Sequence, residues 1–551
     1  MGIFSKGFTF LLKDFACWTS THGIPHIGGS NNIILRIFWI LVVIACILGF
    51  LVQLQTLIRK YLAFSVNTET KLNFEERHFP VVTICNMNPW KKNDVANRSK
   101  YMEELMKAYN TQAASSYFGF TSVRNGARRQ RAARLTSLAS SHLFDVSDGS
   151  NNGTNTFYED PGYNYNDMVV SCTYNAATCN ETLFARYFDA TYGRCVQFNF
   201  NEHQNSSRAG PLYGLRLTLK AEQGKYLPWV ESAGAVVAIH NKSELPYPDV
   251  GGYYAPIGTA SAFGVKYVAT TRQPAPYGDC STITQVKSKN YEGTYQVETC
   301  YRCCTQDEII KQCGCYYPGL PYAQGDAYSS CFIEGANSTS YETTSRNLNC
   351  IDSVMTGGFD ILKACDCPQP CEVQTYATTA TTAMWPSLGF TPNECNEKKQ
   401  DEKPRMEGMT GKNTTKCLDW YKKNTLLIEV YYERMNYQVL SESPAYTFVS
   451  CLSEIAGQVG LFLGMSIISV FEFFTLLLLI FYYVSSHKSR RMELAAIDEY
   501  VKNAEEERAA LDRKAEEKEA KRRAEKLRKE ADLYDDDHHD SALPPKVTNA
   551  E

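Results

Sequence analysis

The residues best suited to chemistry lie in an unusually polar membrane segment, Val449 to Val484. Three glycines and two carboxylates interrupt its apolar run: Gly457, Gly460, Gly464, Glu454 and Glu472. The segment is also longer than the roughly 20 residues that cross a bilayer as one helix. A carboxylate that faces lipid is costly, so such residues usually face a protein interior or a water-filled path. Glycines and hydroxyls at mid-depth favour a place where the backbone leaves regular helix. The pattern predicts the wall of a pore.

A second apolar run, Ile33 to Ile58, is long enough to span a membrane and carries no charge beyond Arg36. Two spans place both chain ends on one side. The basic cluster His487 to Arg491 follows the last span, as is typical of a cytosolic face. We therefore expect a multi-pass plasma-membrane protein with five parts: a cytosolic segment 1–32, a span 33–58, an extracellular domain 59–447, a span 448–484 and a charged helical cytosolic tail 485–551.

The segment between the spans carries the marks of an extracellular domain. Of the 20 cysteines, Cys17, Cys46 and Cys451 lie outside it and 17 within, a density typical of an oxidising compartment. A metal site is disfavoured because the histidines do not cluster with the cysteines. All N-x-S/T glycosylation sequons also fall here: Asn97, Asn152, Asn180, Asn205, Asn241, Asn337 and Asn413. Together these features predict a disulfide-rich α+β ectodomain.

Periodicity predicts several elements. We expect strands over 81–85, 214–220, 235–240 and 425–432, and helices over 301–316 and 490–533. The last helix is interpreted as a solvent-exposed helix with many oppositely charged pairs four residues apart, rather than as a coiled coil. Residues 124–134 are expected to form an exposed basic loop, and 145–168 an irregular surface insert. Within the loop, Arg128 to Arg131 resembles a furin-type processing site, the alternative being a loop that is never cut.

Four motifs in order resemble the degenerin/epithelial sodium channel superfamily. The first is His22-Gly23 and the second is Phe79 to Asn86. The third is a cysteine-rich motif made of two stretches, Pro276 to Cys280 and Cys365 to Cys371. The fourth is Gly460 to Ser466. Two further stretches, Val52 to Phe64 and Tyr187 to Asp189, look most like the FMRFamide-gated (neuropeptide-gated) branch. The resemblance implies a membrane protein with two transmembrane helices per subunit and a large disulfide-rich α+β ectodomain, assembled as a trimer.

The resemblance also implies a cysteine pairing that spacing alone cannot settle. Seven bridges follow from it: Cys85–Cys195, Cys172–Cys179, Cys280–Cys371, Cys300–Cys367, Cys304–Cys365, Cys313–Cys350 and Cys315–Cys331. Cys395 and Cys417 are expected to close an eighth over the insert between them. Cys303 is then the odd cysteine of the extracellular segment.

Pore roles follow from the same resemblance. In a trimer, Gly464, Met465 and Ser466 would form a narrow selectivity belt of carbonyl and hydroxyl oxygens that replace part of the hydration shell of sodium. The alternative is that Gly460 and Gly464 only let helices pack closely. Ser453 is expected at the degenerin position, near where amiloride-type blockers act. Ser469 and rings of Glu454 and Glu472 are expected to line the pore. His22-Gly23 is expected to form a re-entrant gate.

A peptide such as Phe-Met-Arg-Phe-amide carries two aromatic groups and a cation, so its site should offer aromatic faces and an acid. The expected contacts are Phe184, Tyr187, Phe188 and Asp189. The alternative is ordinary packing of a helix face, since Phe184 and Phe188 are four residues apart.

The combined expectation is a ligand-gated, amiloride-sensitive sodium channel, and not an enzyme, that opens to extracellular FMRFamide-like peptides as a homotrimer in membrane lipid. A proton-gated or constitutively open channel of the same superfamily is the alternative. A non-conducting receptor or adhesion molecule needs no glycines or carboxylates in its span, and Glu472 argues against it. No cofactor, nucleic acid or catalytic residue is expected.

Overall fold

The computed structural model describes residues 2–111, 116–122, 125–148, 161–287, 290–322, 328–356, 360–395, 414–486 and 493–536. Contacts within the chain divide it into two units. One comprises Met1–Phe64 with Tyr446–Glu551, and the other Ser65–Ala445.

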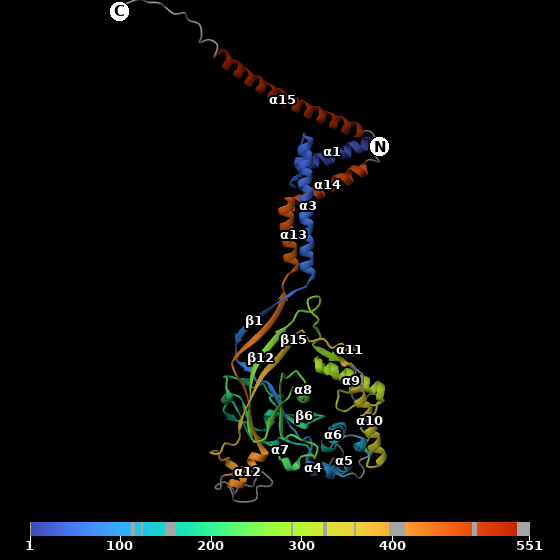
Figure 1. Cartoon of the computed structure of the whole chain (residues 1–551), viewed down its shortest axis with the longest axis vertical. Coiled ribbons are helices and arrows are strands. Elements are labelled where there is room, and N and C mark those ends of the chain that lie inside the picture. The colour runs from blue at the N-terminus through green and yellow to red at the C-terminus, as the bar shows by residue number, and fades with distance from the viewer. Residues whose placement is uncertain are drawn as a thin grey trace, which may run out of the picture. The chain divides into compact units, whose positions relative to one another are not determined.

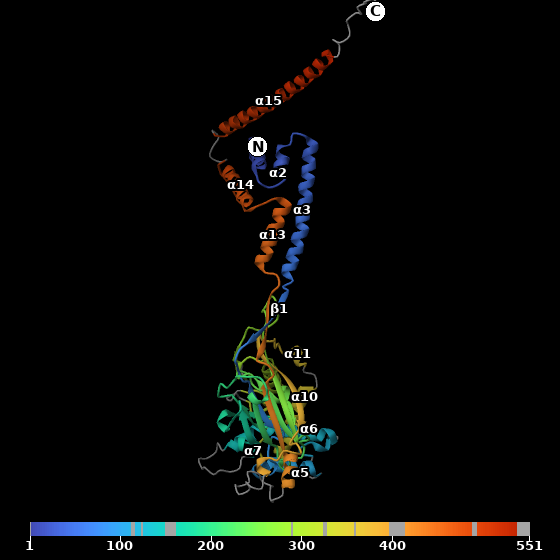
Figure 2. The ribbon, with the colours of Figure 1, turned by 90° about the vertical axis from the view of Figure 1, so that its left-hand side faces the viewer.

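The first unit is helical. Its helices are α1 (Gly2–Trp18), α2 (Ile24–Gly29), α3 (Ile33–Leu62), α13 (Phe448–Leu463), α14 (Ile467–Ser486) and α15 (Glu493–Asp536). The side chain of Asn32 caps α3 by accepting the amide of Ile34. Helix α13 runs beside α3 (Figures 1 and 2). Their contact is close, because a Cβ built on Gly49 would lie 2.9 Å from the ring of Phe462.

Among the described residues, one helix and one bent pair of helices are long and apolar enough to cross a membrane. By length and composition, α3 qualifies alone. The segments Phe448–Leu463 and Ile467–Tyr483 qualify together, as a pair bent by 76° at a short break. The sequence predicted that the long apolar segment breaks at Gly464 to Ser466, and the helix boundaries confirm the break.

The second unit is built on two sheets (Figure 1). In the described residues the larger sheet has eight strands, with β15 (Glu372–Met384) paired to β12 and the others in this order: β1 (Val66–Phe74), β17 (Asn436–Pro444), β12 (Thr259–Thr271), β16 (Thr425–Tyr432), β9 (Leu215–Lys220), β4 (Val169–Tyr174), β5 (Ala177–Thr178). The smaller sheet runs β11 (Tyr253–Pro256), β10 (Gly234–His240), β3 (Val81–Asn86), β7 (Gly193–Phe198), β6 (Phe184–Asp189). The four expected strands are thereby confirmed.

Short elements and helices complete this unit. Two ribbons pair β2 (Arg77–His78) with β8 (Asn205–Ser206) and β13 (Gln285–Lys287) with β14 (Glu292–Thr294). The helices are α4 (Lys92–Arg98), α5 (Lys100–Asn110), α6 (Asn125–Asp148), α7 (Tyr165–Met168), α8 (Pro248–Gly251), α9 (Val297–Cys313), α10 (Ser338–Thr356), α11 (Ile361–Ala364) and α12 (Thr414–Asn424). Single 3₁₀ turns lie at Phe120–Ser122, Glu181–Leu183, Pro211–Tyr213, Gln223–Lys225 and Asn393–Cys395. Helices thus occur where the sequence predicted them near residues 301–316 and 490–533.

Two apolar cores hold the second unit together. The first fills the space against the sheets and includes Val82, Phe198, Leu217, Phe263 and Ile428. Every residue of β3 is buried, including the polar Thr83 and Asn86. The second lies among the helices and includes Trp90, Met102, Leu135, Ile309 and Leu348. Helix α5 contributes buried residues at three- and four-residue spacing, as an amphipathic helix does.

The cysteine pairing is confirmed. Within the described ranges the bridges are Cys85–Cys195, Cys172–Cys179, Cys280–Cys371, Cys300–Cys367, Cys304–Cys365, Cys313–Cys350, Cys315–Cys331 and Cys395–Cys417. Three of them anchor α9, at Cys300, Cys304 and Cys313. Cys303, on the same helix, belongs to none of these eight bridges.

The expectation of an exposed basic loop at residues 124–134 is wrong. Residues from Asn125 onward form α6, because Ala132, Leu135 and Leu138 recur on one face and are fully buried. The side chain of Arg131 is also buried, with 9% of the residue's surface exposed. Its Nε donates to the carbonyl of Phe118 at 2.7 Å. The expected insert at 145–168 is partly helical, since α6 extends to residue 148 and α7 covers Tyr165–Met168. Its residues 149–160 lie outside the described ranges.

We predict that furin does not cut after Arg131. A processing protease needs an exposed, extended segment, whereas Arg128 to Arg131 lie in a helix. The guanidinium of Arg131 is also held by Asn349 Oδ1 at 2.8 Å and by the carbonyl of Ser345 at 3.2 Å. Co-expression with furin should leave the surface chain at full length on immunoblots, while a cleavable reporter in the same cells is cut. A fragment ending at Arg131 would contradict this.

Candidate functional site

The three residues of the expected selectivity belt occupy the break between α13 and α14. Gly464 ends α13 in the left-handed conformation, with φ 63° and its amide donating to the carbonyl of Gly460 at 2.9 Å. After the break, the amide of Ser466 donates to Ser469 Oγ at 3.1 Å, which begins α14. The backbone therefore leaves regular helix at this point, and the amides of Gly464 and Ser466 each find an acceptor close by in the sequence.

The His22-Gly23 pair lies directly on this break. The amide of His22 donates to the carbonyl of Leu463 at 3.0 Å. A Cβ built on Gly464 would overlap Nδ1 of His22, so no larger residue fits there. Gly23 is equally constrained, with φ 85° and a hypothetical Cβ 2.5 Å from Val43 Cγ2 on α3. The two glycines allow the N-terminal segment to lie against both α3 and the end of α13.

Glu472 fastens the same segment one turn further along α14. Its Oε2 accepts the amide of Ser20 at 2.8 Å, the hydroxyl of Thr19 at 3.0 Å and the hydroxyl of Ser20 at 3.1 Å. Ser20 Oγ also lies 2.5 Å from Ser469 Oγ. Hydrogen bonds to a carboxylate are stronger than neutral ones, so this cluster holds the N-terminal segment on α14. We call the cluster of Thr19, Ser20, Ser469 and Glu472 the clasp.

The N-terminal half of α13 holds the other carboxylate. Glu454 Oε1 lies 3.4 Å from Lys60 Nζ of α3, and Lys60 Nζ also lies 4.1 Å from the ring centroid of Tyr446. Both charged side chains are about half exposed, so we assign this pair only ~0–1 kcal/mol. Ser453, the expected degenerin position, is exposed beside it.

The expected peptide contacts lie on a strand, so the interpretation of Phe184 to Phe188 as a helix face is wrong. In β6, alternate side chains point to opposite faces. Phe184 is buried in the sheet core, 5.3 Å from the ring of Phe198. Phe188 packs at 4.5 Å on Phe144 of α6. β-Strand pairing with β7 decides the structure here, a long-range effect that local spacing does not reveal.

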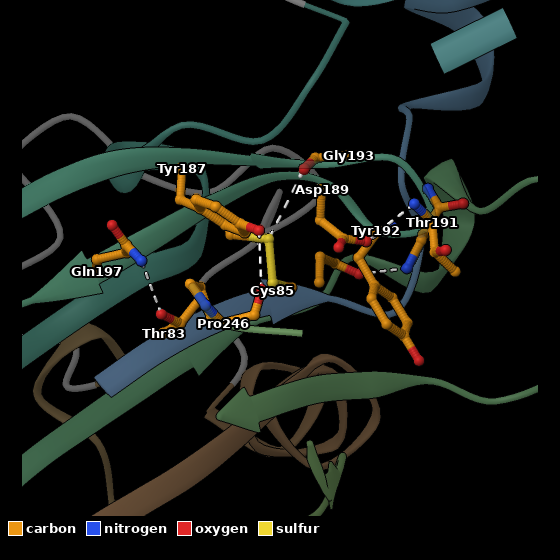
Figure 3. Close-up of a disulfide and its surroundings, with 12 residues drawn as sticks. Thr83, Cys85, Tyr187, Asp189, Thr191, Tyr192, Gly193, Gln197 and Pro246 are labelled. Carbon is orange, nitrogen blue, oxygen red and sulfur yellow. Dashed lines mark hydrogen bonds between the residues drawn. A yellow bond between two sulfur atoms is a disulfide. The ribbon is translucent and has the colours of Figure 1, made fainter. Parts of the chain in front are cut away.

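Tyr187 and Asp189 lie on the opposite face of β6, beside the Cys85–Cys195 bridge (Figure 3). Asp189 Oδ1 accepts the amides of Thr191 and Tyr192, both at 2.9 Å, which closes the turn after the strand. Burial raises the pKa of Asp189 above its ordinary value, and these two bonds oppose that effect. Oδ1 of Asp189 is thus engaged by its own turn.

Tyr187, one of the four expected contacts, lines a cavity with a volume of about 270 Å³, and the other three do not line this cavity. The tyrosine hydroxyl donates to the carbonyl of Pro246 at 2.8 Å. Burial raises the pKa of Glu244, which shares the cavity. Other lining residues include Gln197, Phe200, Lys242 and Tyr291. The cavity combines aromatic faces with both charges.

The described sequons are accessible to different degrees. Asn97, Asn180, Asn205 and Asn337 are exposed, and Asn241 is half-buried with its amide donating to Gln374 Oε1. Asn180 Oδ1 accepts from the amide of Thr182 at 3.2 Å, so the sequon residues already face each other. Asn152 and Asn413 lie outside the described residues. Among the described residues, no group of three or more histidine, cysteine or acidic side chains could hold a metal ion.

Sequence reasoning missed three residues of this site: Thr19, Ser20 and Lys60. The two hydroxyl residues stand immediately before Thr21 and His22, so a run of donors preceding the His-Gly pair was the available signal. Helix α1, which positions them, was also missed, because residues 1–32 were treated only as a short cytosolic segment. Lys60 gave no signal beyond its place at the end of a span.

Comparisons with known proteins agree on one family. The family model described as amiloride-sensitive sodium channel matches residues 15–476. The degenerin-like protein asic-2 of Caenorhabditis elegans is 30% identical over 493 residues, covering 86% of this chain and 87% of its own length. Degenerin del-1 of the same organism is 36% identical over 319 residues, covering 57% of this chain and 44% of its own length. Degenerin mec-10 of Caenorhabditis briggsae is 26% identical over 647 residues, covering 88% and 86%.

We predict that Gly464→Ala displaces His22 from the break. The added methyl group would overlap the imidazole, and a residue other than glycine at positive φ costs about 1–2 kcal/mol. The reporter is Thr21→Cys, at a buried position, in a chain lacking Cys17, Cys46 and Cys451. With Gly464→Ala added, the thiol at position 21 should react ~10-fold faster with a charged thiol reagent than it does when Gly464 is kept.

The matched control is Gly457→Ala in the same helix, since a Cβ there would meet nothing within 4 Å. Equal reaction rates in the two glycine variants would show that His22 does not depend on the space above Gly464.

Proposed function

Because the chain belongs to the amiloride-sensitive sodium channel family, within the degenerin/epithelial sodium channel superfamily, we propose that it forms a sodium-selective pore as a homotrimer in the plasma membrane. Its spans would be α3 and the broken pair α13–α14, with both termini in the cytosol. Apolar length supports the spans, and the sequons and disulfides of the intervening unit support an extracellular location for it.

The observation that carries the pore assignment is the break at Gly464 to Ser466. Three copies around an axis would present backbone carbonyls and the Ser466 hydroxyl as a narrow ring of oxygens. A broken membrane helix is tolerated where it lines a water-filled path or is covered by protein, and the N-terminal segment covers one side of this one. By resemblance, Ser453 remains the degenerin position, near which amiloride-type blockers would act.

Ser469 and Glu472 extend the proposed pathway beyond the belt. A carboxylate in a membrane helix must be paired or hydrogen-bonded, and Thr19 and Ser20 supply that partner here. All three bonds converge on Oε2. We propose that His22, Gly23 and the two hydroxyl residues form the gate element and that Glu472 both anchors it and attracts cations.

We predict that Glu472→Gln lowers cation conductance or the preference for sodium over potassium, because a ring of three charges becomes neutral while shape is kept. Glu472→Asp, which keeps the charge, is the control. The measurement is single-channel conductance with bi-ionic reversal potentials. If both quantities are unchanged in the glutamine variant, Glu472 is not part of the ion pathway.

For the stimulus, we propose an extracellular FMRFamide-like peptide. The cavity beside Tyr187 offers aromatic faces and a carboxylate within one site, which is the chemistry such a peptide requires. Phe184, Phe188 and Asp189 would then act by positioning β6 and its turn, since each is engaged inside the fold.

Proton gating is the second candidate, and one observation favours it. Burial raises the pKa values of Glu244 and Asp189, so both carboxyls become protonated at a higher pH than exposed ones as the solution is acidified. Voltage clamp of the expressed chain distinguishes the candidates: FMRFamide at neutral pH should open it, and acid alone should not. Current evoked by acid but not by peptide would reverse the assignment.

We predict that Asp189→Ala destabilises the ectodomain by about 0.5–1.5 kcal/mol, because the part-buried amides of Thr191 and Tyr192 lose their acceptor. Asp189→Asn keeps an acceptor oxygen and should cost less. Thermal unfolding of the purified chain and peptide concentration responses should be measured together. Asp189 would instead be a direct ligand contact if two results coincide. The asparagine variant would keep its stability, and its peptide response would shift as strongly as that of the alanine variant.

A further inference from the structure

A second cavity, of about 210 Å³, lies in the helical unit between α1 and α14. None of the expected pore or gate residues lines it. Its walls come from both helices: Phe10, Leu11, Asp14, Phe15, Trp18, Leu476, Leu479 and Tyr483. We propose that this cavity binds a small hydrophobic ammonium compound, with the cation at Asp14 and the apolar body against the aromatic rings.

The aromatic wall is built by helix periodicity. Leu11, Phe15 and Trp18 are spaced by four and three residues, so they share one face of α1. Phe15 is buried and meets Trp18 edge-on, with 5.2 Å between ring centroids. Trp18 remains 47% exposed. Faces of Trp, Tyr and Phe attract ammonium groups, most strongly when water is excluded.

Asp14 supplies the charge that selects the ligand. It is the one charged residue among the eight that line the cavity. Within the described part of the chain, no hydrogen bond or ion pair engages its carboxylate. An anion at the edge of an aromatic wall is complementary to a cation that carries an apolar body.

A soluble amine fits this site better than a lipid amine headgroup does. An ethanolamine headgroup brings a phosphate next to its ammonium, and none of the eight lining residues is basic. The volume is also small for anything larger than a single ring with a short ammonium arm.

Occupancy would bear on the neighbouring clasp. Trp18 directly precedes Thr19, whose hydroxyl donates to Glu472, and Phe15 packs on Phe473 with 5.3 Å between ring centroids. A ligand held by α1 and α14 together would therefore stabilise the docked N-terminal segment. This inference concerns binding and stands apart from sodium conduction, so either can fail without the other.

The test is equilibrium dialysis of labelled benzyltrimethylammonium with the full chain in phosphatidylcholine nanodiscs. Asp14→Asn should weaken binding at least about fivefold, because the charge partner is lost. Asp14→Glu, which keeps the charge, should bind within about twofold of the native chain. Neopentylbenzene, the uncharged analogue of the same shape, should bind the native chain more weakly than the cation does and should not distinguish Asp14→Asn.

Three results would overturn the proposal. Equal binding of the cation to the native chain and Asp14→Asn would remove Asp14 from the site. Equal binding of the cation and its uncharged analogue would leave only an unselective apolar groove. Displacement of the probe by phosphatidylethanolamine in the nanodisc would make a lipid, not a soluble amine, the occupant. Tyr483→Leu provides a second variant, which should weaken binding of the cation more than that of its analogue.

Discussion

A break inside an apolar helical segment frees backbone groups that need hydrogen-bond partners, and the N-terminal segment of the helical unit supplies one of them. At the break after α13, the carbonyl of Leu463 is taken by the amide of His22, and the amide of Ser466 by Ser469 Oγ. Gly464 ends α13 at φ 63° and leaves the space that the His22 ring fills. The N-terminal segment is therefore a structural part of the break. The carboxylate of Glu472 holds the N-terminal segment in place by accepting the amide of Ser20.

The two strands of the second unit that lie next to α3 and α13 in the sequence pair with each other. β1 begins shortly after α3 ends, and β17 ends shortly before α13 begins. The two strands pair antiparallel from Val66 opposite Pro444 to Phe74 opposite Asn436. Just beyond β1, the guanidinium of Arg77 lies 3.4 Å from the ring centroid of Tyr437 on β17 and 4.3 Å from that of Tyr267 on β12. β1 and β17, which lie next to α3 and α13 in the sequence, are thus tied to β12 of the large sheet.

Local sequence patterns predicted the features that depend on local chemistry. The helix break follows from glycines and hydroxyls in an apolar run, and the strands from alternation. The disulfides came from family resemblance, and the family comparisons agree with that resemblance. Features set by distant partners were missed. Residues 184–189 pair with β7 instead of forming a helix, and the arginines of α6 are drawn into a helix by an apolar face whose partners lie far along the chain. The clasp at Glu472 joins residues more than 450 positions apart, and no local pattern signals such a contact.

The most direct test of the docked N-terminal segment is a disulfide trap between its two nearest hydroxyls. Ser20 Oγ and Ser469 Oγ are 2.5 Å apart, so the double variant Ser20→Cys with Ser469→Cys, in a chain lacking Cys17, Cys46 and Cys451, can form a bridge with little movement. Mild oxidation of membranes that contain this variant, followed by mass spectrometry, should yield a peptide linked between positions 20 and 469 within one chain, and neither single variant should. If the double variant stays reduced under conditions that preserve the Cys395–Cys417 bridge, the segment does not lie on α14, and the break must be satisfied in another way.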